Sequence, residues 1–362
     1  KIISTHHTGN RDNVAANVEA RDHMASIDNG SNILTSMTFT RYNANATIPC
    51  DIQWEIIEYL AAAGGANEFK VLAATAQAFL TTEDSITTGV IGGVTTDADV
   101  VVWNTGQRAN TANSATLNGS FTTSWDSAND KAVLDRLRTN NEAAVLSYAV
   151  VEFVGSNWVI QRVSHNYAVA GDTETETLGT TLGATSKAFL HVQYRKDAND
   201  NNCTECHRVW ISSTTQLSFA TNVNAVITGK IGVAWVIENT QASGTVMTAT
   251  HYAPAGWTGS GTFGNTVTAV AATTTTSVEG CCATNGQATP SGAAHVASLW
   301  LTTTTNVNIF RARPLDTLTY RFTTVEWPTA AVGLAPTVND SATAAENVTM
   351  HVPIHLRMEK LS

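Results

Sequence analysis

Four stretches of the chain share nearly the same pattern of apolar and polar residues, and each contains a glutamate at or next to its end. They read DIQWEIIEY, VLSYAVVEF, GVAWVIEN and TYRFTTVEW. Successive side chains of a strand point to opposite faces, so each glutamate faces away from its β-branched predecessor. Large apolar groups occupy both faces, which predicts strands in the middle of a two-layer packing. The glutamates are Glu58, Glu152, Glu238 and Glu326.

The glutamates recur at intervals of 94, 86 and 88 residues, and other segments recur with them. RVWISSTTQLSF at 208–219 resembles SLWLTTTTNVNIF at 298–310, and VSHNYAVAG at 163–171 aligns with ATHYAPAG at 249–256. The second alignment equates His165 with His251. A fixed period indicates repeated structural units, here of about 90 residues. We therefore expect an all-β fold of tandem β-sandwich or jelly-roll-like units, in an elongated or ring-like chain, each with its own small core.

The period also sets the expected domain boundaries. Complete β-sandwich units are expected at residues 61–152, 153–238 and 239–328. Residues 1–60 contain the later strands of a unit without its opening strand, and residues 329–362 resemble the opening of a unit without the rest. This predicts an incomplete N-terminal unit and a separate C-terminal tail.

The tail contains ENVTMHVPIHLRMEKL at 346–361, in which Val348, Met350 and Val352 alternate with polar residues before Pro353. A proline at this place predicts an edge strand. An unpaired edge in the N-terminal unit would promote association unless another strand covered it. We hypothesise that the tail completes an N-terminal unit by strand addition, in its own chain or, as we favour here, in the next subunit of a polymer.

Composition narrows the classes of partner. Charged residues make up 14% of the chain and the net charge is −10, so binding to a phosphate backbone is disfavoured and we expect no nucleic-acid partner. No run of 18 apolar residues occurs, so we expect no membrane span. With few charges, the surface must consist largely of Thr, Ser, Asn and Gly, residues that suit strands and turns.

The motif CTECH combines Cys203, Cys206 and His207 in the C-x-x-C-H pattern that attaches c-type haem. It occurs once, in a very polar loop, and a later loop again carries two cysteines, Cys281 and Cys282. Disulfides among these four cysteines, free thiols, a metal site and a haem remain open. We expect no cofactor, and pairing of the thiols in an oxidising compartment.

Motifs of catalysis are weak or missing. GSGTFG at 259–264 fits G-x-G-x-x-G, but strand-like sequence follows where a dinucleotide site needs a helix. The four glutamates could form a catalytic set or a metal ring, yet one per unit favours a structural role. Each could accept backbone N–H bonds at a corner or pair with an arginine of the preceding strand. The candidate arginines are Arg41, Arg138 and Arg313. We expect no enzymatic activity.

The strand pattern of an aromatic residue, β-branched residues, glutamate and a second aromatic resembles repeated β-domains of tailed-phage virion proteins and related extracellular fibres. Its residues are Trp54–Tyr59, Tyr148–Phe153, Trp235–Asn239 and Phe322–Trp327, with Arg41, Arg138 and Arg313 in preceding strands. The third copy departs from it, with Ala234 and Asn239 in place of aromatics. The resemblance implies particle or fibre architecture.

These observations predict a structural subunit of an extracellular particle or filament, within a virion of a phage or virus, that assembles with copies of itself. One alternative is an adhesin or carbohydrate-binding protein that stacks sugars on exposed Trp158 and Trp257. A second alternative is a filament subunit that carries a single haem at Cys203, Cys206 and His207.

Overall fold

The computed structural model describes part of the 362-residue chain. The described residues are 2–6, 23–27, 37–41, 50–51, 53–59, 63–109, 121–137, 143–169, 171–195, 207–221, 229–253, 256, 258, 261–272, 276–285, 298–311, 317–327, 332–334, 341–342 and 348–350. These residues form strands joined by turns, with two short 3₁₀ turns, η2 (Asp97–Asp99) and η3 (Thr185–Lys187). The predicted all-β fold is confirmed.

One strand order occurs three times, with the glutamate strand hydrogen-bonded between two antiparallel neighbours. The central strands β11 and β17 are buried over almost their whole length, which is why both of their faces are apolar. The three sets, in spatial order, are β6 (Lys70–Phe79), β11 (Ala144–Glu152) and β8 (Val100–Ala109); β12 (Trp158–Asn166), β17 (Ile231–Asn239) and β14 (Ala188–Arg195); β18 (Thr248–Tyr252), β23 (Thr317–Glu326) and β20 (Thr276–Asn285).

A second strand order also occurs three times, in sheets built on a hairpin. In three of their strands, β10, β13 and β15, more buried positions alternate with more exposed ones, as expected where only one face of a sheet meets a core. The sheets are β7 (Ser85–Thr87), β10 (Lys131–Arg136) and β9 (Phe121–Asp126); β13 (Thr173–Thr177), β16 (Gln216–Ala220) and β15 (Arg208–Ser213); β19 (Gly261–Thr266), β22 (Asn306–Arg311) and β21 (Ser298–Thr303). We call β6–β11 unit 1, β12–β17 unit 2 and β18–β23 unit 3.

The two ends of the chain meet in the same strand orders. The strand β5 (Gln53–Tyr59) lies between β1 (Ile2–His6) and β24 (Val332–Leu334), and β3 (Met37–Arg41) lies between β2 (His23–Ile27) and β26 (Val348–Met350). A short pair joins β4 (Cys50–Asp51) to β25 (Ser341–Ala342). We call β1–β5 with β24–β26 the N-terminal unit. In the single chain, the tail thus pairs with its own N-terminal strands; Val352 and Pro353 lie outside the described residues.

The register of the sheets shows which strands of the N-terminal unit and of unit 1 correspond. Lys70 lies opposite Glu152 in β6, and Gly333 lies opposite Glu58 in β24. The strand β24 therefore takes the place in the N-terminal unit that β6 takes in unit 1. One further pair, Met24 with Gly106, links β2 to β8 and extends the sheet of unit 1 to six strands.

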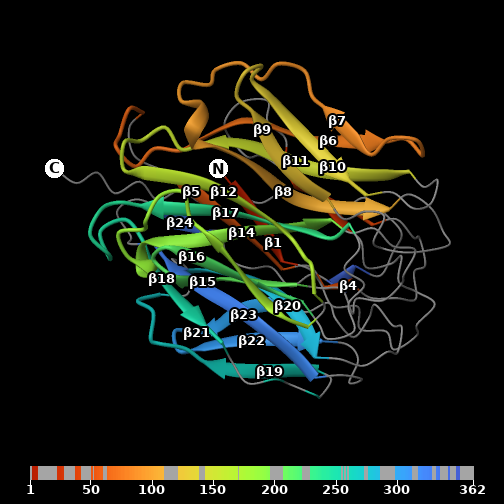
Figure 1. Ribbon diagram of the computed structural model, residues 1–362. Helices are drawn as coiled ribbons and strands as arrows, with labels where there is room; N and C mark the ends of the chain where they lie inside the picture. The colour runs from red at the N-terminus through yellow and green to blue at the C-terminus, as the bar shows by residue number, and fades with distance from the viewer. Residues whose placement is uncertain are drawn as a thin grey trace.

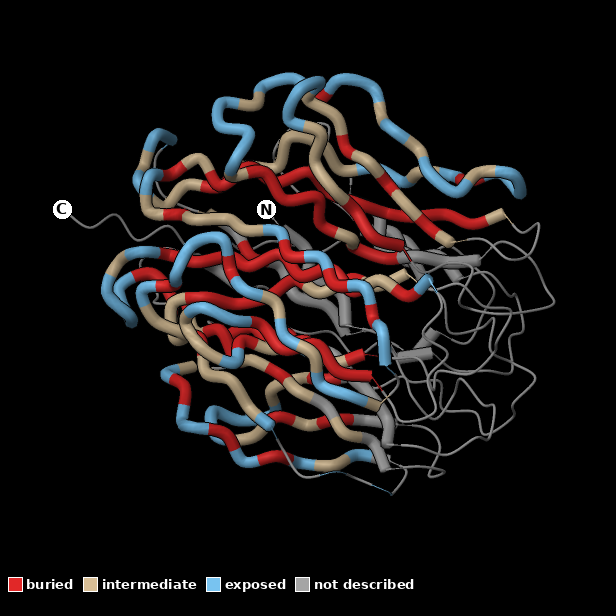
Figure 2. Tube along the Cα trace, in the orientation of Figure 1, coloured by how far each residue is buried: buried red, intermediate tan, exposed pale blue. Residues whose placement is uncertain are grey.

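The units share part of their core, which differs from the expectation of separate small cores. Units 2 and 3 each contain an apolar cluster of their own. The largest cluster, however, combines unit 1 with Ile57, Phe189 and Trp235, and with Trp327 at the end of unit 3. Figure 2 shows the buried segments running through the middle of the stacked sheets. The interior of unit 1 is therefore partly supplied by its neighbours.

One kind of contact recurs between successive units. The first strand of each hairpin packs on the next unit: β2 on β8, β9 on β14, β15 on β20, and β21 on β5. The series begins and ends at the N-terminal unit, so the units follow one another in a closed order. Units 1, 2 and 3 appear from top to bottom in Figure 1, in orange to yellow, green and blue.

Candidate functional site

Three of the four glutamates occupy the same position in their sheets. Glu152 lies opposite Val100, Glu238 opposite Ala188, and Glu326 opposite Thr276, the first residue of the neighbouring strand in each case. The segment just before that neighbouring strand therefore passes beside the carboxylate.

Glu152 uses its carboxylate to hold that segment. Its Oε1 accepts the backbone N–H groups of Thr95 and Thr96 at 2.7 and 2.6 Å and the hydroxyl of Thr95, while Lys70 Nζ lies 2.9 Å from Oε2. The side chain is fully buried. Burial alone would raise its pKa, but the hydrogen bonds from Thr95, Lys70 and Thr96 outweigh burial and hold the pKa below its ordinary value. This carboxylate is therefore ionised, and groups of the protein itself contact both of its oxygens.

Glu238 and Glu326 make the equivalent bond. Glu238 Oε1 accepts the N–H of Gly183 at 2.6 Å, and Glu326 Oε2 accepts the N–H of Ala271 at 2.7 Å. We call each such arrangement a glutamate clasp, since it ties the preceding loop to the end of the central strand. The sequence left two kinds of partner open for these glutamates, backbone N–H groups and an arginine. In the clasps the partners are backbone N–H groups.

The expected arginine partners cannot be compared with this geometry. Arg138 and Arg313 lie outside the described residues, as do the side chains of Arg41 and Glu58. For Glu152 the cation is Lys70, which comes from the opening strand β6 rather than from the preceding strand β10. The clasps lie in separate units and form no common carboxylate set.

A buried polar group joins unit 1 to unit 2. His191 Nε2 accepts hydrogen bonds from the Asn104 N–H and from Gln193 Nε2, both at 3.1 Å, and its ring stacks on Trp103 at 4.2 Å. Gln193 Oε1 accepts the N–H of Thr123 at 2.8 Å, which fixes the orientation of its amide. Burial lowers the pKa of His191 to about 3, so the ring is neutral and can accept both bonds.

The joint between units 2 and 3 is built in a similar way. His251 of β18 bonds through Nε2 to the Thr185 carbonyl at 3.0 Å and through Nδ1 to Thr323 Oγ1 at 2.8 Å. Burial lowers its pKa, although the bond to Thr185 acts in the opposite direction. Two residues before Thr323 in β23, the guanidinium of Arg321 lies 4.3 Å from the ring centroid of Trp210 in unit 2.

The pairing also corrects one alignment. His165 lies opposite Gly232, six residues before Glu238, whereas His251 lies opposite Thr323, three residues before Glu326. The two histidines are therefore not equivalent. The residue that matches His251 is Arg162, whose Nε donates to the Thr123 carbonyl of unit 1 at 2.9 Å. Both matched residues thus reach back to the preceding unit.

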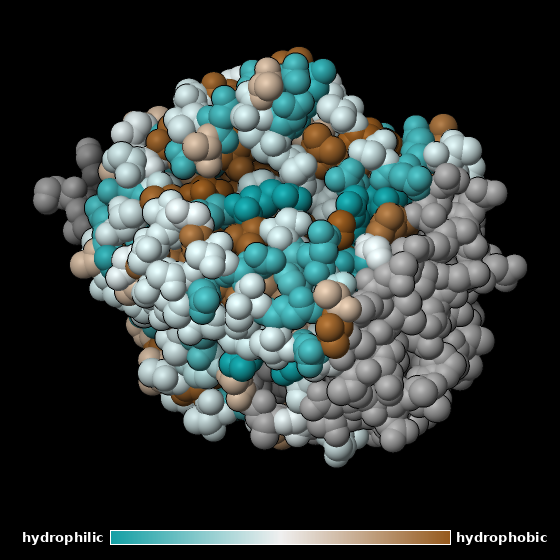
Figure 3. All heavy atoms as spheres, viewed as in Figure 1, coloured by the Kyte–Doolittle hydropathy of each residue, from teal (hydrophilic) through white to brown (hydrophobic). Residues whose placement is uncertain are grey.

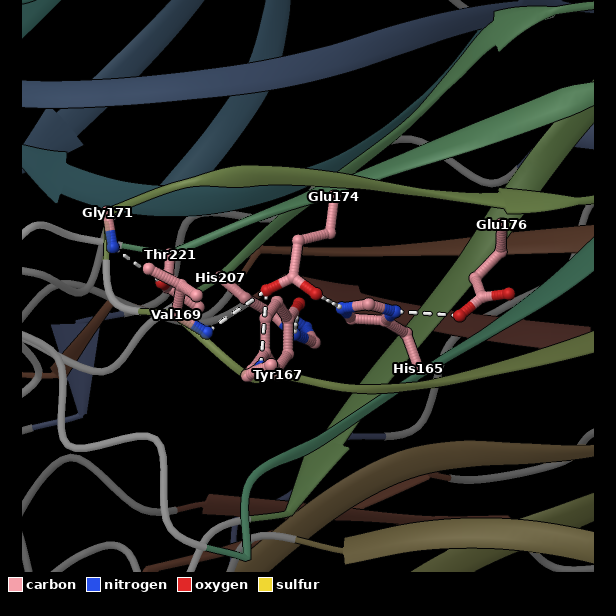
Figure 4. Close-up of polar contacts among 9 residues, drawn as sticks. His165, Tyr167, Val169, Gly171, Glu174, Glu176, His207 and Thr221 are labelled. Atoms are coloured by element: carbon pink, nitrogen blue, oxygen red, sulfur yellow. Dashed lines mark hydrogen bonds and ion pairs between the residues drawn. The ribbon is translucent and has the colours of Figure 1, made fainter.

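Several titratable side chains of unit 2 lie close together (Figure 4). His165 stands between two carboxylates, with Nδ1 2.8 Å from Glu176 Oε1 and Nε2 3.2 Å from Glu174 Oε2. Glu174 also accepts the N–H groups of Ala168 and Val169, and so holds the turn between β12 and β13.

His207 lies on the other side of Tyr167 in the same cluster. Its Nδ1 is 2.7 Å from the Tyr167 hydroxyl, and the buried Lys230 ammonium is 5.5 Å from the Tyr167 ring centroid. Burial, and then the charges of Lys230 and His165, hold the pKa of His207 well below its ordinary value. These contacts connect β12 to β13 through His165, and they connect the residues next to the ends of β12, β15 and β17, which are Tyr167, His207 and Lys230.

The structure describes some of the residues on which the cysteine predictions depend. Cys203 and Cys206 lie outside the described residues, and Cys281 and Cys282 are described as backbone of β20, opposite Arg321 and Tyr320. His207, the third member of the haem motif, is buried against Tyr167 and Tyr194. In the motif GSGTFG, residues 261–264 begin the strand β19; of the strand-like sequence that follows the motif, residues 265 and 266 continue this strand, whereas residues 267–272 form no strand.

Of the two tryptophans proposed to bind sugars, Trp158 is only 4% exposed and packs edge-on against Phe153 with ring centroids 5.0 Å apart. This part of the prediction is wrong, because Trp158 is packed in the largest apolar cluster, at the start of β12. Trp257 lies outside the described residues.

Within the described part of the chain, no three His, Cys, Asp or Glu side chains are grouped as a metal site would require. No helix among these residues is long and apolar enough to cross a membrane. Comparison with known proteins does not identify the chain: no protein-family model, no curated protein and no solved structure matches it.

Proposed function

We propose that the protein is a structural subunit of an extracellular particle or filament, and within that class a virion component of a phage or virus. The observation that supports this most is the glutamate clasp. The same carboxylate chemistry is used in three units to fix a loop to a strand. Repeated use of a charged group for internal bonding suits a scaffold, whereas a catalytic carboxylate must face a substrate.

The surface is consistent with such a role. Charged residues are 14% of the chain, and on the face seen in Figure 3 apolar residues form separate groups among neutral and hydrophilic ones. The buried histidines are engaged with neighbouring units or strands. For a haem filament, His207 would have to give up its packing against Tyr167, and a sugar-binding role loses Trp158. Neither alternative is favoured by a contact in the described residues.

Electron microscopy of the purified protein at increasing concentration tests the proposal. Filaments or particles of uniform dimensions are expected, since a structural subunit must assemble through defined contacts. A protein that stays monomeric across concentration, ionic strength and pH, and that turns over a substrate or binds a glycan, would contradict it. Separately, a Soret absorption band would identify the haem alternative.

A further inference from the structure

Two sheet edges of the N-terminal unit are covered by strands from the far end of the chain. The strand β24 pairs with β5 through three residues, and β26 pairs with β3 through three. In unit 1 the equivalent strand β6 pairs with β11 through nine. The ladder of β24 is thus much shorter than that of its counterpart, whereas the ladder of β26 is as short as that of β7 with β10, its counterpart in unit 1.

The connection to β24 does not mark it as a special tail. Five residues separate β23 from β24, and five separate β11 from β12. A unit that lies beside unit 3 can therefore receive β24 through a connection of the same length as the one that joins unit 1 to unit 2. Packing of β21 on β5, and not a long connecting segment, decides that the N-terminal unit receives β24.

Recognition at these edges is through backbone hydrogen bonds. A strand edge accepts any strand of suitable register, and the same edge in a second copy of the chain is chemically identical. Without a partner, β5 and β3 would each expose unpaired N–H and C=O groups, which promote association. The edges must then be filled either by the chain's own strands or by those of a neighbour.

We propose that β24 and β26 of one copy pair with β5 and β3 of another copy in the assembled state, so that the closed monomer opens into a head-to-tail chain. This inference rests on the proposed function as a self-assembling subunit and specifies its contact. The contact is heterologous, because a C-terminal segment meets an N-terminal one, and such contacts extend without limit unless they close.

A cysteine cross-link between chains tests the exchange. Val332 and Tyr59 are register partners in the β24–β5 pair. In a chain whose five natural cysteines are replaced by serine, V332C and Y59C are made as separate full-length variants. The two are mixed at high concentration and oxidised. We expect a covalent heterodimer whose yield rises with concentration, and a ladder of oligomers from the double variant.

The matched control mixes V332C with T87C, whose residue pairs with Val133 in unit 1 and faces no C-terminal strand. This mixture should give little heterodimer. A double variant that yields only the internally closed monomer at every concentration, with no heterodimer in the mixture, would overturn the exchange.

A second variant keeps the test decisive if the cysteine-free chain does not fold. Gly333→Pro in the natural sequence removes the N–H opposite Glu58. Light scattering should then show loss of the concentration-dependent oligomers that the unchanged protein forms. Equal oligomer formation by both proteins would contradict the proposal.

Electron microscopy of the same samples separates this inference from the proposed function. Regular particles with only internal cross-links would leave the function standing and remove the exchange. Heterodimers without regular particles would support the exchange and count against the function.

Discussion

Unit 1 and the N-terminal unit contain the same strand order but are assembled differently. In unit 1, β6, β11 and β8 all come from residues 70–152, and the central strand pairs with each neighbour through nine residues. In the N-terminal unit, β5 pairs with β1 through five residues and with β24 through three, and β24 lies more than 250 residues further along the chain.

The difference shows where this architecture is strong and where it is weak. Contiguous strands are brought together by short connections, so little loop-closure entropy opposes their long ladders. The N-terminal unit has short ladders and closes the longest loop in the molecule. Its stability must therefore depend on packing against units 1 and 3, through β2 on β8 and β21 on β5.

Removing the C-terminal strands should have the largest effect. A chain that ends after Pro328 lacks β24 and β26, which exposes the edges of β5 and β3. Amide exchange in the strands β1 to β5 should become fast, while units 2 and 3 keep their protection. The control ends after Met350 and retains both strands. Unchanged protection in the shorter chain would show that the N-terminal unit does not need the closing strands.

Breaking the clasp of unit 1 should come next. Glu152→Gln keeps the size of the side chain but removes the charge that Lys70 and three donors share. Loss of a buried, hydrogen-bonded charge costs about 2–3 kcal/mol. Glu326→Gln, at a partly exposed clasp, should cost about 1 kcal/mol or less. Urea unfolding measures both, and equal losses would argue against burial as the source of the difference.

Acid should weaken the joint between units 1 and 2. The unfolded His191 takes up a proton near its ordinary pKa of 6.5, whereas the folded ring does so only near pH 3. Its contribution is complete above pH 6.5 and is lost as the pH falls from there towards 3, at up to about 1.4 kcal/mol per pH unit.

His191→Gln can still accept the Asn104 N–H and does not titrate. The difference in unfolding free energy between pH 7 and pH 5 should therefore be smaller in this variant than in the unchanged protein. Val169→Thr, at an exposed site, serves as the control and should keep the full pH dependence. A variant with undiminished pH dependence would place the acid-sensitive group elsewhere.

The smallest effect is expected at the joint between units 2 and 3. Trp210→Leu removes the ring that faces Arg321 and leaves an apolar side chain in its place. At a partly exposed position this contact contributes about 0.5–1 kcal/mol. A double-mutant cycle with Arg321→Gln isolates it, and a coupling energy of zero would mean that the two side chains do not interact in solution.

The sequence predicted those features that depend on local pattern. Columns of β-branched and aromatic residues around Glu152 and Glu326 place these strands at the centre of a sheet, because such strands must be apolar on both faces. The pairing of a C-terminal strand with the N-terminal unit was also anticipated, although β24 was missed because VGL at 332–334 is too short to give an alternation.

The joints could not be predicted in the same way. His191 and Gln193 lie in β14 with ordinary polar neighbours, and their partners Asn104 and Thr123 are some 70 to 90 residues away. The confusion of His165 with His251 has a related cause. Both histidines follow the preceding glutamate by 13 residues, but the residue opposite the next glutamate is Val159, seven residues after Glu152, in β12 and Thr248, ten residues after Glu238, in β18. Contacts between units depend on register in three dimensions, which a linear pattern does not encode.

The order of synthesis gives the closing strands a further consequence. The strand β5 leaves the ribosome about 270 residues before β24, and at roughly 5–20 residues per second this delay lasts on the order of tens of seconds. Units 1, 2 and 3 can pair their own strands during that time, while the edges of β5 and β3 wait. Neighbouring nascent chains on one messenger would then present finished C-terminal strands to unfilled edges, so translation itself would influence whether a copy closes alone or joins another.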